Sequence, residues 1–386
     1  MRDELISLIK KIDIVREAGE ALLTGAKALN IFGLADTQKG CFLAALAGLR
    51  KNNGPLVFLL PGRDEVRNYR RELNYFYPEQ EMLELYPENL TQVRADAKNQ
   101  EVAAARIMAL RAMHAKDFSI TFVTAESLLQ RLPAAEAIFN SNLVVKVEDV
   151  VEQETLIAKL VKMGYERTEQ VEALGQFCLR GDIMDIYPIN EVDPVRIEWF
   201  DNNIDSVRSF DIKNQRALQV KDSVEIVSLG ITEKADNANI FEYLSAPATI
   251  IMDEPAKIFE TLRNLFGENV QDSARLFMPE EIMAACEKHG CLSVSALPHR
   301  FFSSQKTFTV PVRAVAPYNR NIDLLVSDLQ GWLNDGLSPL IMMGNIDKAK
   351  NIAESLKGRG LPAGYAQKGQ LFLPGQISVF AGELSA

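Results

Sequence analysis

The sequence is poor in cysteine, histidine and tryptophan. Its 386 residues include only 4 cysteines, 3 histidines and 2 tryptophans. Four scattered cysteines are too few for the disulfide framework of a secreted protein, so we expect reduced thiols and a cytoplasmic protein. No apolar run reaches the ~18 residues of a membrane-spanning helix, and no basic region followed by an apolar run predicts a signal peptide.

Basic charge is also in deficit. The chain has 42 Lys and Arg residues against 52 Asp and Glu residues, a formal net charge of -10 at pH 7. Broad nonspecific DNA binding relies on basic side chains that face phosphates, so this balance predicts only weak binding to duplex DNA. The hydrophobic fraction of 47% supports a large core, and the length fits two to four domains.

Strand and helix patterns alternate along the first part of the chain. Ala28–Phe32 and Leu56–Leu60 are apolar runs typical of buried strands, and the helix patterns Lys39–Leu49 and Arg63–Phe76 follow them. This order predicts a parallel sheet. Changes in pattern divide the chain into an α/β domain, a small α+β module, a return to α/β, and a further α/β domain, at residues 1–140, 141–228, 229–314 and 315–386.

The last of these units breaks off after a strand pattern, Ile377–Phe380. A parallel sheet normally continues with a helix that covers it. We therefore expect the chain to be part of a longer protein.

A strand–loop–helix pattern begins at Gly33, where a phosphate-binding loop would lie. Such a loop needs glycines for close approach to phosphate, a Lys for its charge, and a Ser or Thr for magnesium. Gly33 and Lys39 stand at the right separation, but Gln38 replaces the second glycine and Gly40 replaces the hydroxyl residue. The loop therefore keeps its shape, and we expect it to have lost productive nucleotide binding.

Two further groups of residues could carry chemistry. Asp253 and Glu254 follow a buried strand pattern, where acids can hold magnesium, although Asp253 before Pro255 is more typical of a helix N-cap. Zinc prefers four sulfur or nitrogen ligands. The spacing of the Cys and His residues is unusual for such a site, so we expect no metal at Cys286, His289, Cys291 and His299.

The most informative stretch reads QFCLRGDIMDIYPINEVDPVRIEWFDNNIDSVRSF, from Gln176 to Phe210. Its runs predict strands, with a tight hairpin at Asp201–Asn203. Successive side chains on a strand point to opposite faces. The core face then holds Val195, Ile197 and Trp199, and the other holds Arg196, Glu198 and Phe200, with Arg180 able to join them. Arginines beside an aromatic are typical of a protein-docking surface, although an ordinary solvated face with an Arg–Glu pair is the alternative.

Three segments of this region resemble a known family. They are GYERTEQVEALGQFCLRGDIMDIYP, PVRIEWFDNNIDSVRSFD and KNQRAL. They closely resemble the module shared by the bacterial repair protein UvrB and the transcription-repair coupling factors (Mfd), in which an R-G-x-x-x-D-[IL]-[FY]-P run precedes an R-[VIL]-[ED]-x-F strand. The altered phosphate loop favours the coupling factors, as does the absence of room between Leu90 and Gln100 for the DNA-clamping hairpin of UvrB.

The resemblance implies a fold and a docking site. The fold would be a parallel-sheet, P-loop-like (RecA-like/UvrB-like) domain in two pieces, with an inserted UvrA-binding module and a further α/β domain after it. The UvrA contacts of the family would fall on Arg180, Arg196 and Phe200, and Glu198 would orient Arg196.

The resemblance also implies a function. The chain would recruit UvrA to stalled RNA polymerase by mimicking UvrB, in transcription-coupled nucleotide-excision repair. ATP, magnesium, DNA and the polymerase would bind parts of the full-length protein that are absent here, and this region would be a monomer without enzymatic activity. The alternatives are a nucleotide-hydrolysing helicase piece that uses Lys39 and Asp253–Glu254, or a module that binds damaged DNA.

Overall fold

The computed structural model describes residues 2–24, 28–35, 37–49, 54–87, 97–114, 119–140, 142–229, 237–244, 248–298, 304–312, 315, 317–319, 321–367 and 374–382. The chain divides into two compact units. One contains Met1–Asn52, Arg63–Glu81 and Leu292–Ala386, and the other contains Asn53–Gly62 and Met82–Cys291.

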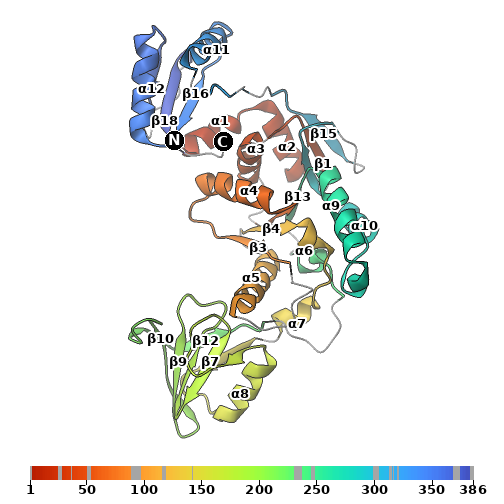
Figure 1. Ribbon diagram of the computed structural model, residues 1–386, viewed down its shortest axis with the longest axis vertical. Helices are drawn as coiled ribbons and strands as arrows, with labels where there is room; N and C mark the ends of the chain where they lie inside the picture. Colours follow the sequence, from red (N-terminus) through yellow and green to blue (C-terminus); the bar gives the residue numbers. More distant parts are fainter. Residues whose placement is uncertain are drawn as a thin grey trace. The chain divides into compact units, whose positions relative to one another are not determined.

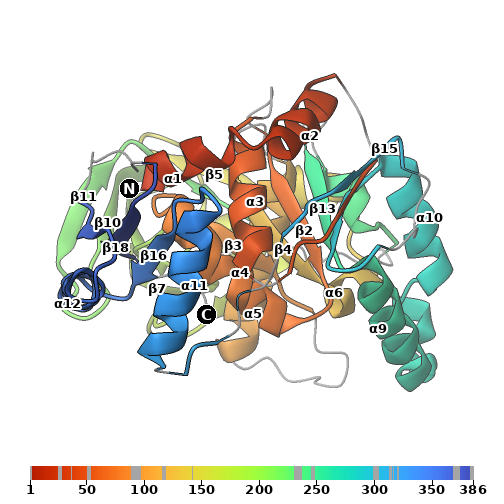
Figure 2. The same cartoon turned by 90° about the horizontal axis from the view of Figure 1, so that it is seen from above.

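The first unit is built on strand β1 (Leu29–Phe32), which is buried along its whole length. It pairs in parallel with β14 (Leu292–Ser295) on one side and with β15 (Lys306–Thr309) on the other. Four helices belong to the same unit: α1 (Arg2–Ile9), α2 (Asp13–Leu23), α3 (Thr37–Ala47) and α4 (Arg63–Phe76). Helix α3 is apolar around most of its circumference because α1, α2 and α4 all pack against it (Figures 1 and 2).

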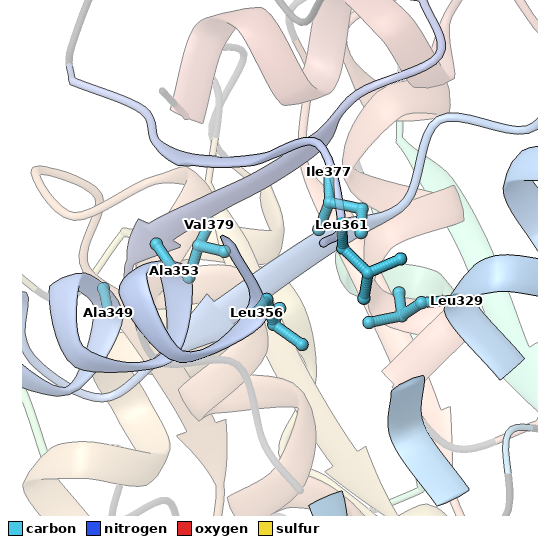
Figure 3. Close-up of a cluster of buried hydrophobic side chains, with 7 residues drawn as sticks. All are labelled: Leu329, Ala349, Ala353, Leu356, Leu361, Ile377 and Val379. Carbon is cyan, nitrogen blue, oxygen red and sulfur yellow. The ribbon is translucent and has the colours of Figure 1, made fainter. Parts of the chain in front are cut away.

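The C-terminal part of this unit is a small α/β fold. It contains α11 (Ile322–Asn334), β16 (Leu340–Met343), α12 (Ile346–Gly358), β17 (Ala363–Tyr365) and β18 (Ile377–Ala381), and its parallel strands run in the order β16-β18-β17. Figure 3 shows its core, which consists of Leu329, Ala349, Ala353, Leu356, Leu361, Ile377 and Val379. The two alanines on α12 lie four residues apart on one helix face, so this helix can approach the sheet closely.

The second unit contains a run of four parallel strands in the order β13-β2-β4-β3. Their bounds are β2 Leu56–Leu60, β3 Met82–Leu85, β4 Ile120–Thr124 and β13 Thr249–Asp253. Every residue of β2 and β4 is buried, as expected for parallel strands covered on both faces. The helices of this part are α5 (Ala97–His114), α6 (Ala125–Leu129), α7 (Ala135–Phe139), α9 (Pro255–Glu268) and α10 (Pro279–His289), with 3-10 turns η1 (Ile240–Tyr243) and η2 (Val270–Arg275).

The inserted module is a six-stranded sheet with one helix, α8 (Gln153–Lys162) (Figure 1). The strand order is β11-β10-β9-β8-β7-β6, and all neighbours except β6 and β7 are antiparallel. The bounds are β6 Glu166–Arg167, β7 Gln176–Arg180, β8 Ile183–Ile186, β9 Val195–Phe200, β10 Asn203–Phe210 and β11 Ala217–Lys221. A separate antiparallel pair joins β5 (Leu143–Lys146) to β12 (Ser223–Ile226).

The predicted fold class, a parallel α/β domain in two pieces with an inserted α+β module, is confirmed, while the exact domain boundaries remain predictions. Helix positions agree to within a few residues; for example, α3 starts at Thr37 rather than Lys39. The hairpin turn uses Asp201, not an Asn, at positive φ (54°). Within the described ranges, no helix combines the length and the apolar character needed to cross a bilayer.

Candidate functional site

Buried and more exposed side chains alternate along strand β9, as the sequence predicts. Val195, Ile197 and Trp199 are buried. On the opposite face, Arg196 and Glu198 are half-buried, and the side chain of Phe200 is 71% exposed. This outer face is the candidate docking face.

Neighbouring strands add residues to the docking face through their register. Arg196 lies directly opposite Asp185 on β8 and opposite Arg208 on β10. Cys178 on β7 lies opposite Asp185 in turn. Since directly paired residues project to the same face of a sheet, these four side chains form one row across it.

Asp185 is the centre of the docking face. Its carboxylate is buried, with 2% of the side chain exposed. It accepts two hydrogen bonds from Arg196, from Nε at 2.6 Å and from Nη2 at 2.8 Å, and a third from Nη2 of Arg180 at 3.0 Å. The hydrogen bond to Asp185 raises the pKa of Arg196 above its ordinary value, despite partial burial, so the guanidinium keeps its charge.

Arg180 and Arg196 therefore converge on one carboxylate but differ in exposure. The Arg180 side chain is 54% exposed, while that of Arg196 is 18% exposed. The sequence motif R-G-x-x-x-D contains both Arg180 and Asp185, yet the role of Asp185 was missed. The role of Asp185 depends on the register of the β8–β9 pair, which places it opposite Arg196.

The prediction that Glu198 orients Arg196 is wrong. Glu198 accepts a hydrogen bond from Ser206 Oγ at 2.7 Å and forms a short ion pair with Arg208. The physical reason is register: Glu198 lies one row further along the sheet, next to Ser206 on β10. Its charge still acts on the pKa of Arg196 as one of the weaker contributions, whereas Asp185 makes the direct bonds.

Apolar side chains lie on the same outer face. Phe200 ends β9 beside the turn, and Ile183 lies opposite Glu198. Val220 on the edge strand β11 lies opposite Arg208 and is exposed, as is Ile183. Exposed apolar groups among arginines are the composition of a protein-docking surface rather than of a plain solvated face.

Two residues of the altered phosphate loop, Gly33 and Gln38, lie in close contact with other groups of the protein. Gly33 has a φ of 90°, and a Cβ there would lie 2.3 Å from the carbonyl oxygen of Val310, so glycine is required. The side-chain Oε1 of Gln38 accepts a hydrogen bond from the backbone N–H of Ala35 at 3.2 Å. Lys39 is buried. Gln38 thus uses one of the loop amides that a phosphate would otherwise need.

A neighbouring helix leaves no room for a side chain at Gly40. A Cβ at this position would lie 1.9 Å from Oε2 and 2.9 Å from Cβ of Glu72, a buried residue of α4. Burial and then the charge of Glu72 raise the pKa of the adjacent Cys41 thiol to about 12. A hydroxyl side chain at position 40 would therefore have to displace Glu72.

We expect Gly40→Thr to lower stability rather than to repair the loop. Both the Cβ and the carboxylate of the buried Glu72 lie too close to the place that a side chain at position 40 would take. Overpacking should therefore cost about 1–3 kcal/mol, and thermal melting measures this loss. The double variant Gly40→Thr/Glu72→Ala is the matched control and should recover part of the melting temperature. If Gly40→Thr alone melts at the wild-type temperature, the Glu72 side chain can move away from position 40 without a cost in stability.

The strand-end acids lie where the sequence placed them, but the predicted cap is displaced by one residue. Asp253 is the buried last residue of β13, and the N-cap of α9 is Glu254, which makes no side-chain capping bond. Glu254 adopts a left-handed conformation with φ of 48°, and Pro255 takes the first helical position. Asp253 and Glu254 belong to the second unit, whereas Lys39 belongs to the first.

The described members of the cysteine–histidine group make local packing contacts. Cys291 Sγ donates a hydrogen bond to the carbonyl oxygen of Cys286 at 3.6 Å. The neighbouring Cys291 side chain, and then burial, raise the pKa of the Cys286 thiol. The ring of His289 stacks on Phe241 at 5.0 Å. His299 lies outside the described residues, as does the segment 88–96 where UvrB would carry its hairpin. No group of three or more metal-ligating side chains occurs among the described residues.

Comparison with known proteins identifies the module first. Residues 143–229 match the family model of the UvrB interaction domain. These residues contain the whole docking face, from Cys178 to Val220. The inserted module is therefore similar to the UvrB interaction domain.

The chain is also similar to transcription-repair-coupling factors. It is 29% identical over 225 residues to the transcription-repair-coupling factor of Bacillus subtilis (strain 168), covering 58% of this chain and 19% of the relative. It is 27% identical over 271 residues to the same factor of Staphylococcus aureus (strain USA300), covering 70% of this chain and 22% of the relative. The chain thus spans about a fifth of the length of these relatives. These findings support the predicted N-terminal region of a transcription-repair coupling factor.

A solved structure with weak similarity is the yeast DEAD-box splicing factor Prp28. It is 9% identical with a TM-score of 0.28, and the match covers 98% of this chain and 69% of that chain. A similarity this low supports no conclusion about fold or function.

Proposed function

We propose that the docking face binds UvrA, and that the chain thereby recruits UvrA to a stalled transcription complex. The observation that carries this proposal is the convergence of Arg180 and Arg196 on the buried Asp185. The shared carboxylate fixes both guanidinium groups before any partner arrives. A fixed arrangement of this kind lowers the entropic cost of binding.

The arginines keep donors for a partner. Among the described residues, Nη1 of Arg196 has no hydrogen-bond partner, and Arg180 uses only Nη2. The planar guanidinium suits a carboxylate, which it can bind through two parallel hydrogen bonds. Phe200 supplies an apolar anchor beside these donors. The proposed surface of UvrA therefore presents acidic groups next to an apolar recess.

The logic of the proposal is mimicry. A module shared with UvrB gives a partner shared with UvrB, while the altered loop keeps this chain from acting as UvrB does. The helicase alternative would use Lys39 and Asp253–Glu254 as its site. It is not favoured, because the chain is similar to coupling factors and its module to the UvrB interaction domain.

Further properties belong to the same proposal. This chain would be a monomer without ATPase activity, and ATP and magnesium would bind in other parts of the full-length protein. RNA polymerase and DNA would also bind there, since the net charge of -10 disfavours tight DNA binding. Because bacterial DNA repair takes place in the cytoplasm, that compartment is part of the proposal.

The experiment that tests the proposal is capture of purified UvrA by the immobilised chain, with and without ATP. The proposal expects capture by the wild-type chain. Loss of capture when the docking face is altered, with the chain still folded, would locate the contact. Failure of the wild-type chain to retain UvrA at micromolar concentration in either condition would contradict the proposal.

We expect no saturable binding of ATP to this chain in titration calorimetry. Gln38 occupies the Ala35 amide, and Gly40 lacks the hydroxyl that would hold magnesium. Titration of ATP with magnesium should give only heats of dilution. Micromolar binding that disappears in Lys39→Ala would show instead that the loop still holds nucleotide.

A further inference from the structure

The turn between β10 and β11 contains a strained residue. Gln215 has a φ of 61°, in the left-handed region that residues with a Cβ rarely adopt. Glycine would adopt the same conformation without strain. Strained residues persist where the surrounding structure fixes them, and they cluster at functional sites. The groups that hold Gln215 in this conformation therefore bear on function.

The turn itself is held by a closed set of hydrogen bonds. Asp211 Oδ1 accepts from the backbone N–H groups of Lys213 at 2.8 Å and Asn214 at 3.1 Å. The backbone N–H of Gln215 donates to the Asp211 carbonyl at 2.8 Å, and that of Asp211 donates to the Arg216 carbonyl at 2.9 Å. These bonds fix the backbone of Gln215, so the direction of its side chain is fixed as well.

The side chain of Gln215 is directed at the docking face. Its Oε1 accepts a hydrogen bond from Nη2 of Arg196 at 2.9 Å, and its Nε2 donates to the Ile212 carbonyl at 3.1 Å. The second bond orients the amide so that its oxygen faces the arginine. The Arg196 guanidinium also lies over the ring of Phe210, with its carbon 4.7 Å from the ring centroid.

Arg196 is therefore held on three sides, by Asp185, by Phe210 and by Gln215. Asp185 binds the Nε and Nη2 side of the guanidinium, and Gln215 takes a further hydrogen of Nη2. The remaining nitrogen, Nη1, has no hydrogen-bond partner among the described residues. The two N–H groups of Nη1 therefore remain available to a partner.

We propose that Gln215 is a positioning residue of the docking face, kept in a strained backbone conformation so that its amide fixes Arg196 for UvrA. This inference rests on the proposed function. A glycine would relieve the strain but would offer Arg196 no acceptor. The strained backbone of Gln215 therefore lowers local stability, while its amide preorganises Arg196.

Three variants of the whole chain separate the amide from the backbone. Gln215→Met keeps the length and the strain but removes the acceptor, and UvrA should bind about ten-fold more weakly, the lower end for a hydrogen bond to a charged group. Gln215→Gly should bind as weakly as the Met variant, with a melting temperature at least as high as the wild type. Gln215→Glu keeps an acceptor for Arg196 but loses the donor to the Ile212 carbonyl, so its affinity should lie between those of the Met variant and the wild type.

A second readout distinguishes positioning from direct contact. With 15N-labelled arginine, hydrogen exchange at Nη2 of Arg196 in the free chain should be faster in Gln215→Met than in the wild type, because Gln215 bonds this nitrogen. Weaker binding of the Met variant with unchanged exchange would mean that Gln215 touches UvrA directly, which contradicts the positioning role.

The outcomes also separate this inference from the proposed function. Wild-type affinity of Gln215→Met, alongside loss of binding in Phe200→Ala, overturns the role of Gln215 and leaves the docking face in place. Wild-type affinity of Phe200→Ala and Arg196→Ala overturns the docking face itself, and the inference with it.

Discussion

Arg196→Ala is expected to abolish UvrA capture at micromolar concentration. Arg196 supplies the two Nη1 donors that are unpaired among the described residues, and truncation of one member of a desolvated interfacial charge pair costs about 2–5 kcal/mol. At ~1.4 kcal/mol per ten-fold, the affinity should fall roughly thirty-fold or more. Titration of UvrA with the wild-type chain and the variant measures the change.

This variant needs a control for stability. The outward position of Arg196 on β9 predicts little effect on folding, but the structure shows that its removal leaves the buried Asp185 with Arg180 alone. A buried charge that loses a partner is strongly destabilising. The double variant Asp185→Asn/Arg196→Ala removes that charge, so it should melt closer to the wild type and still fail to bind. If the double variant is folded and binds normally, Arg196 is not a UvrA contact.

Trp199→Ala is expected to unfold the inserted module. The Trp199 side chain is buried on the core face, and its Nε1 donates to the Val151 carbonyl at 2.9 Å. Loss of a buried Trp to Ala costs about 3–5 kcal/mol, and for a module of this size that lowers the melting temperature by more than about 10 °C. Thermal unfolding followed by circular dichroism measures the shift.

Trp199→Phe is the matched control for this variant. It keeps most of the buried apolar surface, but it loses the hydrogen bond to Val151, at a cost of about 1 kcal/mol, and part of the packing, so it should destabilise the module much less than Ala does. The Phe variant should therefore stay folded and bind UvrA. Unchanged stability of Trp199→Ala would mean that Trp199 is not part of the module core.

The alternation of β9 could be predicted because it depends only on spacing along one strand. The buried Val195 and Ile197 and the exposed Phe200 follow from that rule. The partners of the charged residues could not be predicted in the same way, because register between strands decides them. Asp185 rather than Glu198 binds Arg196, since the β8–β9 pairing places Asp185 opposite it.

Contacts between segments that are distant in the chain could not be predicted from the sequence either. The spacing of Gly33 and Lys39 predicts a loop and a following helix, but the contact of Gly40 with Glu72 depends on how α3 and α4 pack. Short exposed strands such as β11 lack an alternating pattern and were not predicted. The strained conformation of Gln215 arises from bonds within a turn whose geometry no propensity specifies.

The most direct test of the docking face is calorimetric titration of UvrA with the wild-type chain and with Phe200→Ala. Phe200 is exposed and makes no hydrogen bond from its side chain, so its removal should leave the fold intact. The account predicts saturable binding by the wild-type chain, an unchanged melting temperature for the variant, and a large loss of its affinity, because an aromatic anchor at an interface contributes strongly. Equal affinity of the two folded proteins for UvrA would contradict it.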